Sequence, residues 1–148
     1  MTSVSSPLRH RARSAASWLI LAWITALVAT LSAVFIGEVL GRTPCVLCWY
    51  QRIFMFPLVL VLGVACYRGD CGIWRYALPL GVVGAAFASY HTLLYWRVIE
   101  PEIVACSAEA SCSGAAMAIF GYVPLPLLSL TAFAVIVLSL LFVRHHTK

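Results

Sequence analysis

The stretch WLILAWITALVATLSAVFI, residues 18–36, holds nineteen residues without a charge. As a helix it is roughly as long as the 30 Å hydrocarbon core of a bilayer, since each residue adds about 1.5 Å. Three further uncharged runs lie at residues 53–67, 76–96 and about 124–143. Such runs differ from the ten-residue alternating segments of membrane barrels, so the sequence predicts four transmembrane helices.

The composition also indicates a membrane protein. Hydrophobic residues make up 63% of the 148 residues and charged residues 10%, whereas soluble domains hold about 45–50% and about 25%. Four helices with short connections favour an up-down bundle. We therefore expect an all-α membrane protein, a four-transmembrane-helix bundle with a single domain over residues 1–148. The predicted spans are roughly 15–37, 47–67, 75–96 and 123–143, and the first span is expected to be retained.

Positive charges are unevenly divided between the two sides of the predicted bundle. If the N-terminus is cytoplasmic, seven of the ten basic residues share its side: Arg9, Arg11, Arg13, Arg68, Arg75, Arg144 and Lys148. Only Arg42, Arg52 and Arg97 lie outside, as the positive-inside rule requires. We predict cytoplasmic termini, a location in the cytoplasmic (inner) membrane, and outer loops at roughly 38–46 and 97–122. The basic residues are divided among short tails and turns. This distribution is typical of contacts with anionic lipid and argues against a nucleic-acid partner.

Six cysteines form three pairs, and the topology assigns each pair to a side. Cys45 and Cys48 lie in the first outer loop, Cys106 and Cys112 in the second, and Cys66 and Cys71 around the inner turn. The outer pairs face an oxidising compartment. The C-x-x-C closes too little chain to stabilise the fold much, so it suits thiol–disulfide exchange better than a structural bridge. Metal sites share the same spacing.

The length of the second span places Arg52 relative to this dithiol. Residues 53–67 alone would give a helix of about 22 Å, which is too short to cross the bilayer. The helix is therefore expected to begin near Cys45 to Cys48, with Arg52 one turn below Cys48 on the same face. A helix N-terminus and a guanidinium both favour the thiolate. The alternative is that Arg52 only marks the membrane interface.

The second outer pair, Cys106 and Cys112, lies in the polar segment ACSAEASCSG, where a disulfide would be exposed and easily attacked. It could also be a simple loop clip. Taken together, the four outer sulfurs could form two inert bridges or ligate zinc, although zinc usually draws on two closely spaced pairs. Because both pairs lie on one side, a relay of disulfide exchange is the favoured interpretation.

These motifs carry a resemblance to a known family. PCVLCWYQR, the second outer cysteine pair, HTLL in the third span and the proline-flanked start of the fourth span resemble the DsbB/BdbC family of disulfide-formation proteins. The short spacing of Cys106 and Cys112 is similar to the compact BdbC branch. Relatives of vitamin K epoxide reductase carry their C-x-x-C after the loop cysteines, and the opposite order here disfavours that family.

The resemblance implies a thiol:quinone oxidoreductase that reoxidises a thioredoxin-like thiol oxidase of the DsbA/BdbD type, so that exported proteins gain disulfides. By analogy Cys106 forms the mixed disulfide with the partner, and Cys112 resolves it or exchanges with Cys45. Cys48 then passes the electron pair to ubiquinone or menaquinone. The shortened second loop leaves the order of exchange between Cys112 and Cys45 open.

The resemblance also assigns two residues to the quinone site. Arg52 matches an arginine that lies against the quinone, and His91 matches a histidine near the same site. From the residues alone, the first interpretation of His91 is a membrane histidine that hydrogen-bonds a neighbouring helix. Cys66 and Cys71 have no counterpart and are expected to be small buried or interfacial thiols. The small residues of 81–88 are expected to allow close helix packing.

Overall fold

The computed structural model describes residues 6–41, 44–96, 98, 118–119 and 123–147. Its long helices are α1 (Ser6–Val34), α2 (Val46–Arg68), α3 (Trp74–Tyr95) and α4 (Leu125–Thr147). A π-helical segment, Phe35–Val39, extends α1, and a 3₁₀ turn, Cys71–Ile73, leads into α3. All four helical segments are long and apolar enough to cross a membrane.

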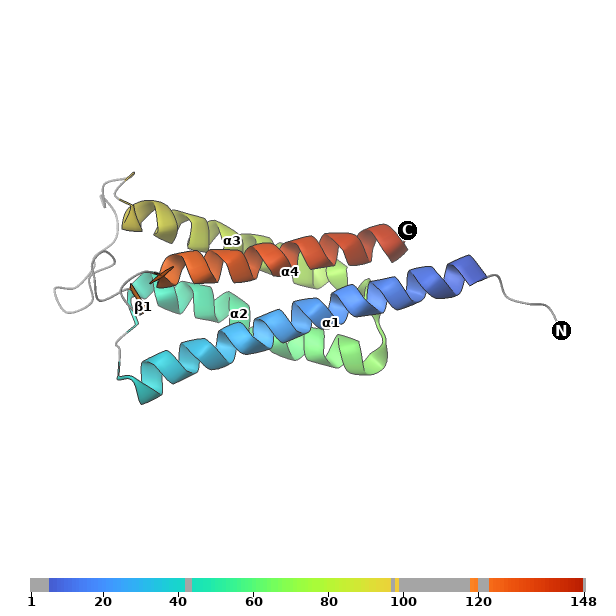
Figure 1. Cartoon of the computed structure of the whole chain (residues 1–148), viewed down its shortest axis with the longest axis horizontal. Coiled ribbons are helices and arrows are strands. Elements are labelled where there is room, and N and C mark those ends of the chain that lie inside the picture. Colours follow the sequence, from blue (N-terminus) through green and yellow to red (C-terminus); the bar gives the residue numbers. More distant parts are fainter. Residues whose placement is uncertain (1–5, 42–43, 97, 99–117, 120–122, 148) are drawn as a thin grey trace.

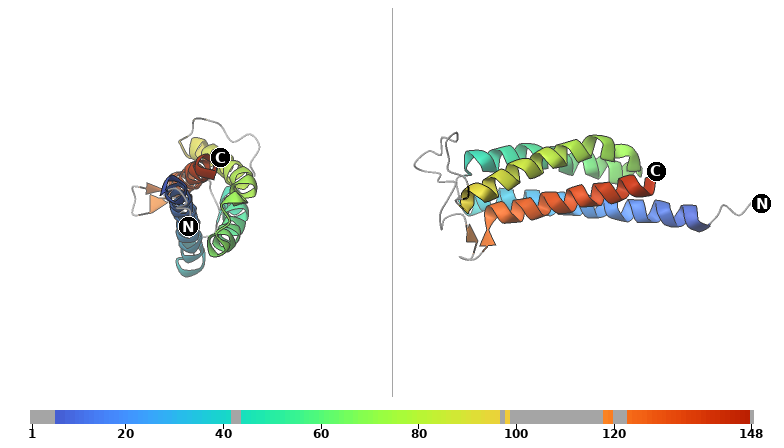
Figure 2. Two further views of the ribbon diagram at one scale, coloured as in Figure 1. Left: turned by 90° about the vertical axis from the view of Figure 1, so that its right-hand side faces the viewer. Right: turned by 90° about the horizontal axis from the view of Figure 1, so that it is seen from above.

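The helices form an up-down bundle in which each packs against its neighbours in sequence and α4 closes the ring against α1 (Figures 1 and 2). As a result, the start of α1 and the end of α4 lie at one end of the bundle, and the start of α2 lies at the other. The predicted all-α four-helix membrane fold is confirmed. The orientation of the termini relative to the cytoplasm stays a prediction.

Helix α2 begins seven residues before the uncharged run that follows Arg52. Its 23 residues give about 34 Å of helix, which is enough to cross the hydrocarbon core. It ends where Gly69 adopts the left-handed conformation, with φ of 65°. A side chain in that conformation is strained, so glycine suits this helix end.

The sequence did not predict two short strands before α4. Strands β1 (Ala118–Ile119) and β2 (Val123–Pro124) pair antiparallel, with Ala118 opposite Pro124. Pro124 therefore precedes α4, and Pro126 is the proline in its first turn. These strands lie at the same end of the bundle as the start of α2 (Figure 1).

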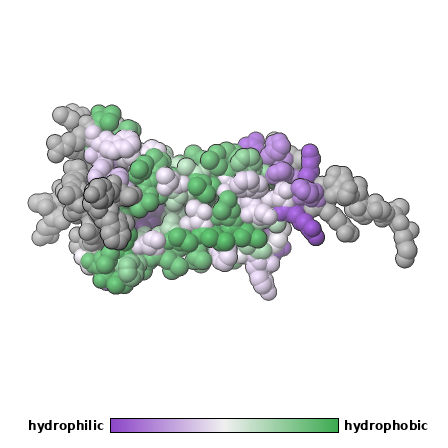
Figure 3. Space-filling view, viewed as in Figure 1, coloured by the Kyte–Doolittle hydropathy of each residue, from purple (hydrophilic) through white to green (hydrophobic). Residues whose placement is uncertain are grey.

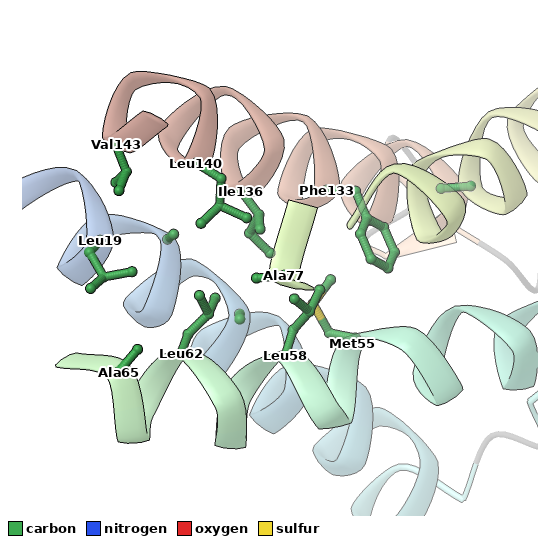
Figure 4. Packing of buried hydrophobic residues seen from close by; sticks show 13 residues of the cluster. Leu19, Met55, Leu58, Leu62, Ala65, Ala77, Phe133, Ile136, Leu140 and Val143 are labelled. Carbon is green, nitrogen blue, oxygen red and sulfur yellow. The ribbon is translucent and has the colours of Figure 1, made fainter. Parts of the chain in front are cut away.

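The core lies between large side chains of α2 and α4, small residues of α3, and Leu19 with two alanines of α1 (Figure 4). Leu58 and Leu62 of α2 and Phe133 and Ile136 of α4 are fully buried. A Cβ atom on Gly84 would overlap the Phe133 ring. The predicted close packing through small residues of the third span is therefore present.

The outer surface of the bundle is apolar, as a lipid-facing surface must be. Leu60 and Val28, for example, are 71% and 56% exposed. Hydrophilic surface gathers where α1 begins and α4 ends (Figure 3). Arginines at that end include Arg11, Arg13, Arg68, Arg75 and Arg144, and the last two lie over the ring of Trp74. This is the end predicted to face the cytoplasm.

Candidate functional site

The C-x-x-C forms the first turn of α2. Cys45 is the N-cap residue, and its Sγ accepts a hydrogen bond from the backbone N–H of Cys48 at 3.3 Å. The first N–H groups of a helix have no partner within the helix, and the helix dipole is positive there. The sulfur of Cys45 thus takes the place of the oxygen that usually caps a helix, where negative charge is stabilised.

The two sulfurs lie close together but differ in exposure. They are unbridged and 2.9 Å apart, so disulfide formation needs only a small movement. Cys45 is 1% exposed and packs with Leu47 and Leu94, whereas Cys48 is half-buried. Of the two, Cys48 is the sulfur that a molecule outside the bundle can reach more readily.

His91 approaches this dithiol from α3. Its Nε2 lies 3.8 Å from Sγ of Cys45, and its side chain is 1% exposed. Its other ring nitrogen, Nδ1, lies 3.1 Å from Nε2 of Gln51, which is also buried. The ring is therefore held between a sulfur and an amide, both contributed by α2.

Gln51 is a site residue that the sequence did not predict. A polar uncharged residue within a span, three positions after Cys48 and next to Arg52, was the available signal. What the sequence lacked was the rotation of α2 against α3, which turns Gln51 toward His91.

Arg52 lies one turn below Cys48, as predicted, and extends toward α1. Its Nη2 donates a hydrogen bond to the Ala33 carbonyl at 2.7 Å, and its guanidinium lies 5.4 Å from the Trp49 ring centroid. Gly37, in the π-helical segment, leaves room for the group, because a Cβ there would come within 3.1 Å of Nη2. Irregular turns of this kind often occur at functional sites. Arg52 makes no hydrogen bond to either sulfur in the described structure.

The surroundings of Cys45 favour its thiolate. The Cys48 thiol and backbone N–H and the ring of His91 hold the pKa of Cys45 below its ordinary value, despite burial. A low pKa is typical of reactive cysteines at helix N-termini. The sequence predicted that the Arg52 guanidinium would favour the thiolate. The groups in direct contact with the Cys45 sulfur are instead Cys48 and His91.

Aromatic side chains continue the site along the α2–α3 interface. Tyr50 and Phe54 of α2 both stack on Phe87 of α3, with centroid distances of 5.2 and 5.6 Å. Tyr50 and Trp49 are more than 40% exposed. The dithiol thus adjoins partly exposed aromatic surface at this end of the bundle.

The four residues assigned to the site that the structure describes converge: Cys45, Cys48, Arg52 and His91 all lie around the first two turns of α2. Cys106 and Cys112 lie outside the described residues. The relay between the two pairs therefore stays a prediction.

Fold and site together define a class, that of four-helix membrane proteins with a redox-capable dithiol at a helix N-terminus. The family model of the disulfide bond formation protein DsbB matches residues 14–143. The chain is 58% identical over 130 residues to a probable disulfide formation protein of Metapseudomonas resinovorans, which covers 87% of this chain and 90% of that one. It is 39% identical over 116 residues to the disulfide bond formation protein C of Bacillus subtilis, covering 78% and 84%.

The chain therefore belongs to the DsbB family of disulfide bond formation proteins, as its motifs predicted. A probable disulfide formation protein of Deinococcus radiodurans is also 39% identical, over 127 residues. No solved structure matches the chain. Its membership identifies a multi-pass membrane protein of disulfide bond formation with oxidoreductase chemistry.

Proposed function

We propose that this protein reoxidises an extracytoplasmic thioredoxin-like thiol oxidase and passes the electron pair to a membrane quinone. The observation that carries the proposal is the dithiol at the N-terminus of α2, with a buried histidine on one side and an arginine on the other. Family membership supports the disulfide chemistry, and the position at the end of a membrane span supports a lipid-soluble electron acceptor.

The electron path uses two disulfide exchanges and one oxidation. The partner's dithiol reduces a Cys106–Cys112 disulfide and becomes oxidised. That pair then reduces a Cys45–Cys48 disulfide and is itself restored. Finally the Cys45–Cys48 dithiol becomes a disulfide again as two electrons and two protons pass to the quinone, which leaves as quinol.

The charged and polar groups around the dithiol fit a quinone. Arg52 uses one of its five N–H groups on Ala33 among the described residues, so others can bind an anionic oxygen. It also lies beside the half-buried Cys48, which is the sulfur proposed to face the quinone. A bound quinone supplies a lipid-soluble two-electron acceptor, and Arg52 stabilises negative charge that develops nearby.

His91 is proposed to handle the proton and charge of Cys45. Its Nε2 faces the sulfur, and Gln51 holds the opposite nitrogen, so the ring stays aligned during the change in charge. When Cys45 is a thiolate, an Nε2–H can donate to it. A histidine in this position therefore favours the reduced dithiol in its anionic form.

The proposed orientation places the dithiol on the extracytoplasmic side of the cytoplasmic (inner) membrane, with both termini in the cytoplasm. The basic end of the bundle supports it, since Arg68, Arg75 and Arg144 lie at the end opposite Cys45. Labelling single-cysteine variants from outside intact cells tests it. The orientation is wrong if residues 45 and 48 react only after the cells are permeabilised.

The decisive experiment combines the purified protein, a reduced thioredoxin-like oxidase and a soluble quinone analogue. We expect quinone absorbance to fall as partner thiols disappear, with one quinone consumed per partner disulfide formed. The double variant Cys45→Ser/Cys48→Ser should lose quinone reduction and keep its helical circular dichroism. Partner oxidation at the full rate without quinone consumption would contradict the proposal.

A further inference from the structure

Three soft or borderline metal-ligand atoms meet at the start of α2. Sγ of Cys45, Sγ of Cys48 and a ring nitrogen of His91 all lie within 4.8 Å of one another. We propose that the reduced form of this site binds a single Zn²⁺ ion through these three residues. The site differs from a zinc site of four outer sulfurs, because Cys106 and Cys112 are not ligands.

The distances are close to those of a tetrahedral zinc site. Zinc–sulfur bonds of about 2.3 Å and zinc–nitrogen bonds of about 2.0–2.1 Å place sulfur and nitrogen ligands roughly 3.5 Å apart and two sulfurs roughly 3.8 Å apart. The observed separation of Cys45 and His91 is 3.8 Å. The sulfurs, 2.9 Å apart, have to separate further, which the half-buried Cys48 can do by a side-chain rotation.

Charge balance favours the ion in this environment. Cys45 and His91 are each 1% exposed, and an unpaired charge is unfavourable at such a site. Two thiolates and one Zn²⁺ form a neutral unit with a neutral histidine. Three protein ligands leave a fourth position for water or a further sulfur, as in many catalytic zinc sites.

Gln51 completes the site as a positioning residue. Metal-bound histidines usually donate their second ring N–H to an acceptor, which orients the ring. The amide of Gln51 lies 3.1 Å from Nδ1, and turning it by half a rotation presents its oxygen instead of its nitrogen. An oxygen there accepts the Nδ1–H and leaves the Nε2 lone pair facing the sulfurs.

The metal site exists only in one redox state. Oxidation to a Cys45–Cys48 disulfide removes both thiolates, so the ion binds the reduced protein alone and opposes its reoxidation. This inference goes beyond the proposed electron path and does not depend on which acceptor takes the electrons.

The test uses the full chain in lipid nanodiscs, with Cys66, Cys71, Cys106 and Cys112 replaced by serine. The protein is reduced with a phosphine and titrated with Co²⁺, which reports tetrahedral thiolate ligation by its absorption. We expect one Co²⁺ per chain, a cobalt–thiolate charge-transfer band and displacement by Zn²⁺. Protein oxidised beforehand should show no charge-transfer band. If the oxidised protein gives the same band as the reduced protein, the proposal is overturned.

Variants then test whether His91 is a ligand or whether the two cysteines bind the metal without it. His91→Ala should weaken Co²⁺ binding by about 100-fold or more, since loss of a ligand should cost at least as much as loss of its hydrogen-bond partner, and should reduce the intensity of the tetrahedral bands. Gln51→Leu should weaken it about 10- to 100-fold. Thr92→Val is the matched control, since Thr92 is buried beside His91 but bonds only the Ala88 carbonyl.

Two outcomes would overturn the proposal even if quinone reduction is confirmed. One is His91→Ala binding Co²⁺ with wild-type affinity and spectrum. The other is a reduced wild-type dithiol that gives no charge-transfer band. If His91→Ala does not fold, as judged by circular dichroism, His91→Gln replaces it. No quinone is present in any arm, so failure of the quinone assay leaves this result intact.

Discussion

A pair of cysteines lies around each end of helix α2, with Cys71 in the 3₁₀ turn that follows it, and the two pairs have different surroundings. At its start, the Cys45 sulfur accepts the Cys48 N–H and faces a histidine ring. At its end, Cys66 and Cys71 pack against the hydrophobic core, and neither sulfur makes a hydrogen bond within the described residues. The same residue type thus occupies a polar, hydrogen-bonded site at one end and an apolar one at the other.

The difference shows that chemistry at a cysteine depends on where the helix begins. The unpaired N–H groups of the first turn stabilise a negatively charged sulfur, and the carbonyl groups of the last turn oppose one. The first pair also lies near Arg52, one turn further along the same helix, and in contact with His91 of the neighbouring helix α3. We therefore expect substitutions at the two ends of α2 to have unequal effects, and the predictions below test that.

The largest effect is expected for Cys48→Ser, which removes the half-buried sulfur of the first pair. No Cys45–Cys48 disulfide can then form, so quinone reduction should fall to background. Steady-state quinone absorbance measures the loss, and mass spectrometry of the trapped partner complex measures whether Cys106 still reacts. Retention of normal quinone reduction by Cys48→Ser would refute the electron path.

Arg52→Ala is expected to lower quinone turnover about 10²- to 10³-fold, as loss of a preorganised charge-stabilising donor does. Oxidation of the partner in a single cycle should remain near the wild-type rate, because that step occurs before the quinone. Arg68→Ala, at the opposite end of α2, is the matched control and should leave both rates unchanged. Equal losses in both assays for Arg52→Ala would show a general structural role.

His91→Ala is expected to have a smaller effect, on the titration of Cys45. Since His91 and Cys48 together lower the pKa of Cys45, removal of the ring should raise that pKa, and the thiolate should appear at higher pH. We expect a shift on the order of one pH unit, equivalent to about 1.4 kcal/mol.

Thiolate absorbance followed against pH measures this shift. The sample is a variant that retains only Cys45 and Cys48, and a metal chelator is present. His145→Ala, at the other end of the bundle, should leave the curve unchanged. A curve for His91→Ala that coincides with the wild-type curve would mean that the ring does not act on the sulfur.

Much of this arrangement was predictable from the sequence because it follows from length and polarity. The shortness of the 53–67 run predicted that α2 begins near Cys45, and helical spacing then placed Arg52 one turn below Cys48. The motif also predicted the family. The helix start and the position of Arg52 need only the rise of a helix and the thickness of a bilayer, whereas the family rests on the resemblance of the motifs.

Contacts between helices were not predictable in the same way. Gln51 and Arg52 are adjacent in sequence, yet one faces α3 and the other reaches α1, since successive helical residues point about 100° apart. Which neighbour each one meets depends on the rotation of α2 in the bundle. Arg52 donates its hydrogen bond to the Ala33 carbonyl next to the irregular, π-helical end of α1. The sequence gives no clear signal for that irregular end.

The smallest effect is expected at the far end of α2, for the double variant Cys66→Ala/Cys71→Ala. Both side chains are partly buried and small, so their loss should change the free energy of unfolding by about 1 kcal/mol or less. Quinone turnover should stay within about twofold of wild type, since neither sulfur lies on the proposed electron path, and any larger effect would have to act through stability. Turnover and thermal unfolding of the double variant, measured beside Cys48→Ser, test this directly. A loss of turnover without a loss of stability would mean that the inner pair takes part in electron transfer, and the contrast between the two ends of the helix would no longer hold.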